Sequence, residues 1–235
     1  MLKTANKGEY LRRADCRHCG IRNLVLFADL NERDLDLIHE PIEELVYGPG
    51  ASLYSIGSRL DHVFTIRSGW IKLLQYQPGG SHRIVRLLST GEVAGLEVWL
   101  NKKTQHHAVA LEEAQVCRLP LATLSRLFEH TPRLQHQLMR RWQQALDSAD
   151  SWITQLSSGN ARARVARFLL FMSSKHNGRP FRLFSCEDIG AVLGITTETA
   201  SRILAEYKRI GLVLETGNHI VQVERAGLEP IAGFG

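Results

Sequence analysis

The segment 185–211, SCEDIGAVLGITTETASRILAEYKRIG, constrains the fold of this chain more than any other stretch. Ser185 and Thr196 are typical N-cap residues, so we expect one helix to begin after each of them. Gly190 is small enough for close approach of the two helices, and Gly194 suits the turn between them. Two helices joined by a short glycine-containing turn predict a helix-turn-helix.

A third helix and a β-hairpin flank this pair. Residues 161–174, ARARVARFLLFMSS, have the apolar spacing of a helix. The two β-rich runs of LVLETGNHIVQV, 212–223, surround Gly217–Asn218, which predicts a hairpin turn. We therefore predict a winged helix-turn-helix, a DNA-binding domain, over residues 159–235.

The second helix of the pair offers side chains suited to base edges. Glu198 and Arg202 are four residues apart and share a helix face. A carboxylate accepts from the cytosine amino group and Arg binds guanine in bidentate fashion, although a plain surface ion pair is the alternative. The predicted base-contacting residues are Thr197, Glu198, Ser201 and Arg202. The predicted phosphate-contacting residues are Thr196, Lys208, Arg209, Lys175 and Arg179.

Charge agrees with a polyanionic partner. The whole chain has a formal net charge of +5, and residues 160–235 contain ten Lys and Arg against seven Asp and Glu. Double-stranded DNA is the predicted partner of this basic region. Charge alone would fit an ordinary solvated surface equally well.

The middle of the chain has a different sequence pattern, which is typical of β-strands. Short β-rich runs, HVFTIRSG, WIKLLQYQ and RIVRLLS, are separated by glycines between residues 48 and 95. Pro78-Gly79-Gly80 predicts a hairpin turn. Before them, Asn31 is a plausible N-cap for a short amphipathic helix over 31–40. We predict an antiparallel β-barrel or sandwich within residues 31–130.

A long helix is predicted over residues 131–158, with Pro132 in its first turn and the linker SSGN, 157–160, after it. Its apolar residues step by three and four, as in a coiled coil, which predicts a homodimer. The predicted dimer seam is Leu138, Trp142, Ala145, Ala149, Trp152 and Leu156. A second apolar line, Met139, Leu146 and Ile153, lies beside it, so one line is expected to pack within the chain.

Composition limits the other classes of function. The apolar share of 44% and charged share of 23% are those of a globular protein. The first ten residues lack the apolar core of a signal peptide, and no apolar run is long enough for a membrane span, so we expect a cytoplasmic protein without membrane contact. The chain contains no nucleophile elbow, P-loop, zincin helix or GxGxxG, and we expect no enzyme.

The barrel, long helix and winged helix-turn-helix resemble, in that order, the CRP/FNR family of bacterial transcription regulators. The motifs that carry the resemblance are IRSGWIKL (66–73), TGEVAGLE (90–97) and DIGAVLGITTETASRILAEYKRIGLV (188–213). The resemblance implies an α+β fold with a cyclic-nucleotide-binding-like jelly roll, and a dimeric regulator, such as an activator, that contacts RNA polymerase. The motif with Glu198, Ser201 and Arg202 resembles the FNR branch, whose half-site is TTGAT in an inverted repeat.

Two cysteines three residues apart, Cys16 and Cys19, lie in the N-terminal segment 1–30. In a reducing compartment such a pair indicates metal binding or redox chemistry. The resemblance implies a 4Fe–4S cluster bound by Cys16, Cys19 and Cys117, and this cluster would respond to oxygen. Val25 stands where the family has a further Cys, so one ligand is missing. Thiol oxidation and cysteines without function are the alternatives.

Three other possibilities are weaker. The cyclic-nucleotide branch holds its phosphate with an Arg-Ser pair, whereas this chain has Thr104, Gln105, His106 and His107 there, so nucleotide binding is not expected. Haem could bind through His106 or His107, although such histidines are more often ordinary surface. The paired histidines would also suit a barrel metalloenzyme, for which further ligands are lacking.

Overall fold

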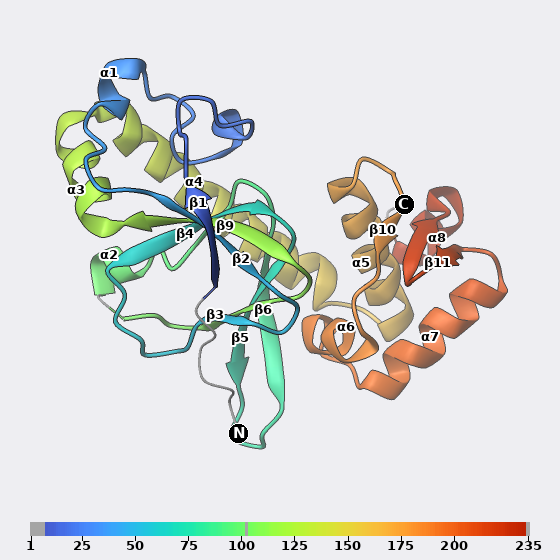
Figure 1. Cartoon of the computed structure of the whole chain (residues 1–235). Coiled ribbons are helices and arrows are strands. Elements are labelled where there is room, and N and C mark those ends of the chain that lie inside the picture. The colour runs from blue at the N-terminus through green and yellow to red at the C-terminus, as the bar shows by residue number, and fades with distance from the viewer. Residues whose placement is uncertain (1–7, 102, 234–235) are drawn as a thin grey trace. The chain divides into compact units, whose positions relative to one another are not determined.

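The computed structural model describes residues 8–101 and 103–233 of the chain. It forms two compact units, one ending at Ala145 and one beginning at Leu146 (Figure 1). The division falls inside the long helix α4 (Pro132–Ser151). Among the helices of the described residues, none combines the length and apolar character needed to cross a membrane.

Two antiparallel sheets build the N-terminal unit. One has the order β1-β2-β9-β4-β7 and the other the order β3-β8-β5-β6. Their strands are β1 (Glu9–Arg13), β2 (Glu43–Tyr47), β3 (Ser52–Tyr54), β4 (His62–Ser68), β5 (Ile71–Tyr76), β6 (His82–Leu88), β7 (Val93–Ala94), β8 (His107–Ala110) and β9 (Ala114–Pro120). This is the predicted jelly roll, although the two sheets remain separate and do not close into a barrel.

Alternation of side chains along the strands puts one face of each sheet into a common core. Phe64 and Ile66 of β4 and Ile71 and Leu73 of β5 belong to this core and are buried. Gly69 lies between these two strands at φ +79°, where a Cβ would meet the Glu113 carbonyl oxygen at 2.4 Å. The turn therefore requires glycine.

Helices and the N-terminal segment form a second core in the same unit. The helices are α1 (Glu32–Leu35), α2 (Val98–Asn101), α3 (Leu121–His130) and α4. Asn31 caps α1 with a complete capping box, which confirms the predicted helix start. Leu26 of the N-terminal segment, Leu127 of α3 and Leu134 of α4 are buried in this second core.

The C-terminal unit is the predicted winged helix-turn-helix (Figure 1). A π-helical turn, η2 (Trp152–Leu156), follows α4. The further elements are α5 (Ala161–Lys175), β10 (Phe181–Arg182), α6 (Cys186–Leu193), α7 (Thr197–Arg209), β11 (Val213–Gly217), β12 (Ile220–Val223) and α8 (Arg225–Ala232). β10, β12 and β11 form one antiparallel sheet. Five of the described elements, β1, α2, α3, β10 and α8, were not expected from the sequence.

Local chemistry explains the sharp turn between α6 and α7. The side chains of Ser185 and Thr196 cap the two helices by accepting hydrogen bonds from the backbone. Gly194 has φ +64° at the end of α6. A Cβ on Gly190 would lie 2.7 Å from the Ile195 carbonyl oxygen, which confirms the need for a small residue there.

Candidate functional site

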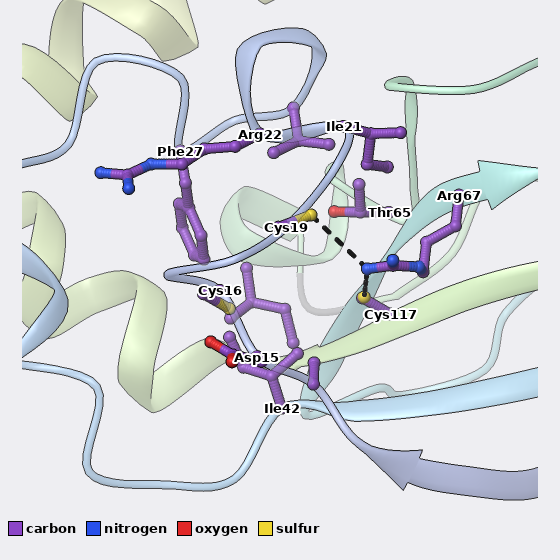
Figure 2. A pocket seen from close by; sticks show the side chains of 13 residues that line it. Asp15, Cys16, Cys19, Ile21, Arg22, Phe27, Ile42, Thr65, Arg67 and Cys117 are labelled. Atoms are coloured by element: carbon purple, nitrogen blue, oxygen red, sulfur yellow. Dashed lines mark hydrogen bonds between the residues drawn. The ribbon is translucent and has the colours of Figure 1, made fainter.

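The three cysteines that the sequence singled out face one small cavity, which we call the cysteine pocket (Figure 2). Cys16 and Cys19 come from the segment between β1 and η1 (Arg22–Leu24), whereas Cys117 comes from β9. Thr65, Arg67 and Val25 are among the other residues of its wall. The cavity has a volume of about 30 Å³.

Sheet register explains the position of Cys117. Cys117 is paired with Glu44 of β2 on one side and with Thr65 of β4 on the other. Directly opposed residues of neighbouring strands point to the same face, so the three side chains form a row across the sheet. Arg67, two residues after Thr65 on β4, reaches the same face.

Arg67 connects the two parts of the pocket. Its Nη1 atom donates to Cys19 Sγ at 3.5 Å and to Cys117 Sγ at 3.6 Å (Figure 2). The same nitrogen lies 3.1 Å from Glu44 Oε1, and Arg12 Nε of β1 donates to Glu44 Oε2 at 2.8 Å. Glu44 is almost completely buried, so it is a buried anion held between two guanidinium groups.

Sequence reasoning missed Arg67, Glu44 and Arg12. Arg67 stood within the quoted motif IRSGWIKL, and a charged residue in an otherwise apolar strand was the available indication. Nothing in the sequence indicated that Arg67 would meet Cys19 and Cys117, which are 48 and 50 residues away.

Burial makes the resting cysteines poor acids. Loss of hydration raises the pKa of Cys16 to about 12, and the neighbouring Cys117 adds to the effect. The pKa of Cys117 is also raised by burial, against which the hydrogen bond from Arg67 acts. Cys16 and Cys117 are therefore neutral thiols at neutral pH.

The pocket matches an iron–sulfur site only in part. Three thiols are the correct kind of ligand, but the fourth position is occupied by Val25, which is buried. The cavity has a volume of only about 30 Å³, and a guanidinium already contacts two of the three sulfurs. Among the residues that the structure describes, no group of three His, Cys, Asp or Glu side chains is placed to hold a metal ion. As arranged, the residues do not fit a four-iron cluster.

The second candidate site is the outer face of α7. Thr197, Glu198, Ser201 and Arg202 are all exposed, whereas Ala200, Ile203 and Leu204 are buried. Within the described part of the chain, no ion pair joins Glu198 to Arg202, so the alternative of a surface ion pair is not realised. Hydrogen bonds from its own backbone N–H and from the Thr196 hydroxyl lower the pKa of Glu198, which keeps its carboxylate ionised.

The predicted phosphate-contacting residues are all exposed, but three of them have partners. Lys208 Nζ donates to Glu215 Oε2 of β11 at 2.5 Å, and the Lys175 ammonium lies 5.7 Å from the centre of the Phe171 ring. Thr196 uses its hydroxyl as the cap of α7. Arg179 and Arg209 are exposed.

The two apolar lines of the long helix have different surroundings. Leu138 is 3% exposed in the second core of the N-terminal unit, and Leu156 is 4% exposed in the C-terminal unit. These two seam residues therefore pack within the chain. Trp142, Ala145, Ala149 and Trp152 are half-buried. By contrast, Met139, Leu146 and Ile153, the other line, are 62–64% exposed.

The residues considered as contacts of a nucleotide or as haem ligands take part in local hydrogen bonds and packing. The Thr104 hydroxyl donates to the Ser55 carbonyl oxygen at 2.6 Å, and the Gln105 carbonyl oxygen accepts from Gln75. His106 lies 4.0 Å from Glu97. The buried His107 packs edge-on against Tyr76, and burial lowers its pKa.

Comparisons with known proteins agree with this architecture. Residues 44–131 match the model of the cyclic nucleotide-binding domain, and residues 163–231 match the model of the Crp-like helix-turn-helix domain. The chain is 31% identical to the fumarate and nitrate reduction regulatory protein of Escherichia coli K12, over 93% of this chain and 90% of that protein. It is 31% identical to the anaerobic regulatory protein of Aggregatibacter actinomycetemcomitans, over 93% and 88%.

A solved structure shows the same fold. FixK2 from Bradyrhizobium japonicum superposes with a TM-score of 0.73 at 24% identity, covering 81% of this chain and 96% of that chain.

Proposed function

This chain belongs to the CRP/FNR family of transcription regulators, and we propose that it binds TTGAT-like inverted repeats as a homodimer under redox control. The observation that carries the DNA-binding part is the exposed face of α7. Glu198 and Arg202 stand there without pairing to each other, at the helix end that enters the major groove in a helix-turn-helix. Arg202 would contact guanine and Glu198 cytosine.

A fluorescence anisotropy titration tests the site preference. The labelled duplex carries a TTGAT inverted repeat, and the control duplex has the same composition in scrambled order. We expect the specific duplex to bind about a thousandfold more tightly or better at physiological salt. Equal affinities for the two duplexes would refute sequence-specific binding.

The exposed apolar line of the long helix supports the dimer. Met139, Leu146 and Ile153 are seven residues apart in the sequence, which is the spacing of a coiled-coil position. Met139 also lines a groove of about 450 Å³ in the N-terminal unit, together with Trp99 and Leu100 of α2. Leu138 and Trp142 of the predicted seam line the same groove. Because large exposed apolar surface is rare on monomers, we assign the interface to this line.

Redox control is supported by the relatives and by the cysteine pocket. One relative is named an anaerobic regulatory protein, and another a fumarate and nitrate reduction regulatory protein. Three thiols from separate parts of the chain meet in one pocket, and thiols are the side chains that oxidants change most readily. A 4Fe–4S cluster on Cys16, Cys19 and Cys117 is the second candidate for the sensing group. The three thiols are the right kind of ligand, but the pocket would have to open and another group would have to supply the fourth ligand.

Iron and acid-labile sulfide analysis of protein purified without air separates these two forms of redox control. Iron and sulfide in equal amounts, together with a sulfide-to-iron charge-transfer band, would establish a cluster despite the missing fourth thiol. If neither iron nor sulfide is found, an air-dependent change of DNA affinity would assign the response to the thiols themselves. Unchanged DNA affinity under both conditions would refute redox control.

The remaining partners follow from this role. A DNA-binding regulator works where the chromosome is, so we place the protein in the cytoplasm. RNA polymerase is the expected protein partner of an activator. In vitro transcription from a promoter that carries the inverted repeat tests this step, with a promoter lacking the repeat as its control.

A further inference from the structure

The mismatch between the cysteine pocket and a four-iron cluster indicates different chemistry. We propose that Cys19 and Cys117 are a redox-active thiol pair that Arg67 holds together and that peroxide joins in a disulfide. This inference rests on the proposed redox control and names the residues that carry it.

The shared donor brings the two thiols close. Both sulfurs accept from the same nitrogen of Arg67, so they lie no farther apart than the sum of its two hydrogen-bond distances, 3.5 and 3.6 Å. Glu44, itself buried, holds that nitrogen at 3.1 Å and so fixes the position of the donor that the two sulfurs share. The contact therefore joins the N-terminal segment to the middle of a sheet.

Cys16 has a different position in the same pocket. Within the described residues it has no hydrogen bond to Arg67, and it lies on the other side of the pocket from the guanidinium (Figure 2). Cys16 is therefore the matched control, since it has the same chemistry and lies in the same pocket but accepts no hydrogen bond from Arg67 in the described structure.

The oxidation balances with one peroxide. One thiol gives up its proton and its sulfur attacks a peroxide oxygen. The O–O bond breaks, and the departing hydroxide takes up that proton, so that a sulfenic acid and one water form. The second thiol then attacks the sulfenic sulfur, an S–S bond forms, and the hydroxyl leaves as a second water. Two thiols lose two hydrogens and two electrons in total, and one hydrogen peroxide becomes two waters.

The disulfide would act on the long helix through the N-terminal segment. Downstream of Cys19, the Leu24 carbonyl oxygen accepts from Arg141 of α4 at 2.5 Å, and Asp29 accepts from Gln137 of the same helix. Asp34 accepts from Arg133 at 2.9 Å. A covalent bond at Cys19 therefore acts on the chain segment that holds α4, the helix we assign to the dimer.

Peptide mapping by mass spectrometry tests the pair. The full-length protein, shown by analysis to be free of iron, is treated with hydrogen peroxide and then alkylated. We expect a Cys19–Cys117 crosslinked peptide that is absent after reduction and in Cys19→Ser, but present in Cys16→Ser and Cys186→Ser. A Cys16–Cys19 disulfide, or sulfinic acids without a crosslink, would overturn the proposal.

Two Arg67 variants test its role as a positioning residue. We expect Arg67→Gln to form the crosslink about tenfold more slowly because the sulfurs lose their common donor. Arg67→Lys, which keeps a cation, should recover part of that rate. Thermal unfolding of each variant separates slow oxidation from misfolding. Wild-type rates in folded Arg67→Gln would overturn this role.

DNA affinity measured on the same samples separates this inference from the proposed function. If peroxide changes DNA affinity while mapping shows no Cys19–Cys117 bond, redox control stands and the thiol pair is refuted. If the bond forms and DNA affinity is unchanged, the thiol pair stands and redox control through these thiols is refuted.

Discussion

Arg202 and Arg209 lie on the same helix, α7, and both are exposed. Arg202 belongs to the early turns, which contact base edges in a helix-turn-helix, whereas Arg209 is the last residue of the helix. The two arginines therefore separate base contact from phosphate contact within one element.

Arg202→Ala should lower the affinity for the TTGAT duplex by about 1–3 kcal/mol and relax the preference at its guanine, because a bidentate contact is lost. Anisotropy titrations against duplexes with each base at that position measure both effects. Arg209→Ala is the control, and should weaken all duplexes alike while reducing the salt dependence. An equal loss on TTGAT and random DNA in Arg202→Ala would exclude base contact.

Gly190→Ala should destabilise the C-terminal unit by about 1–3 kcal/mol, since overpacking forces neighbouring atoms apart. The added Cβ would meet the Ile195 carbonyl oxygen at 2.7 Å, and that oxygen belongs to the backbone of the turn. Chemical denaturation monitors the change. Ala205→Ser, at an exposed position of α7, is the control for a small substitution in the same unit. An unchanged transition midpoint in Gly190→Ala would mean that the turn adjusts at no cost.

At the scale of the element, the long helix has one apolar line that is buried or half-buried in the described structure and another that is exposed. Leu138 is buried and Met139 next to it is 63% exposed. A helix can bury only one side against its own unit, so the remaining line is available to a second copy.

Leu146→Asp should weaken dimerisation about 100-fold, because two like charges would meet within the exposed apolar line that we assign to the interface. Sedimentation velocity over a range of concentrations measures the monomer–dimer equilibrium. Ser148→Asp, an exposed polar position on the same helix, is the control and should remain dimeric. A wild-type protein that is monomeric at micromolar concentration would refute the dimer itself.

At the scale of the whole molecule, a dimer of winged helix-turn-helix domains must place two α7 helices in successive major grooves. The half-sites of its target must therefore lie on one face of the duplex, about one helical turn or a multiple of it apart.

Inserting about 5 base pairs between the TTGAT half-sites should abolish the advantage of the repeat, because half a turn rotates one half-site to the opposite face of the duplex. Inserting a full turn should restore part of the affinity. Anisotropy titrations of the two spacing variants test the geometry. Equal binding to both would indicate that each copy contacts DNA independently.

The sequence by itself determined the elements that depend on neighbours along the chain. The caps Ser185 and Thr196 and the turn glycine Gly194 act within a few residues, so their pattern predicted α6 and α7 at the correct places. The same is true of Asn31 at the start of α1. The set of exposed residues on α7 followed from helical periodicity alone.

Only the tertiary structure decided the features that join distant parts of the chain. Periodicity identified two apolar lines on the long helix, but which line faces inward depends on the core that receives it, and burial of Leu138 answers that question. Sequence spacing placed Cys16 and Cys19 together, whereas the meeting of Cys19 with Cys117 through Arg67 depends on strand register and on how the N-terminal segment crosses the sheet. Such contacts are set by packing of the complete sheet, and no local pattern encodes them.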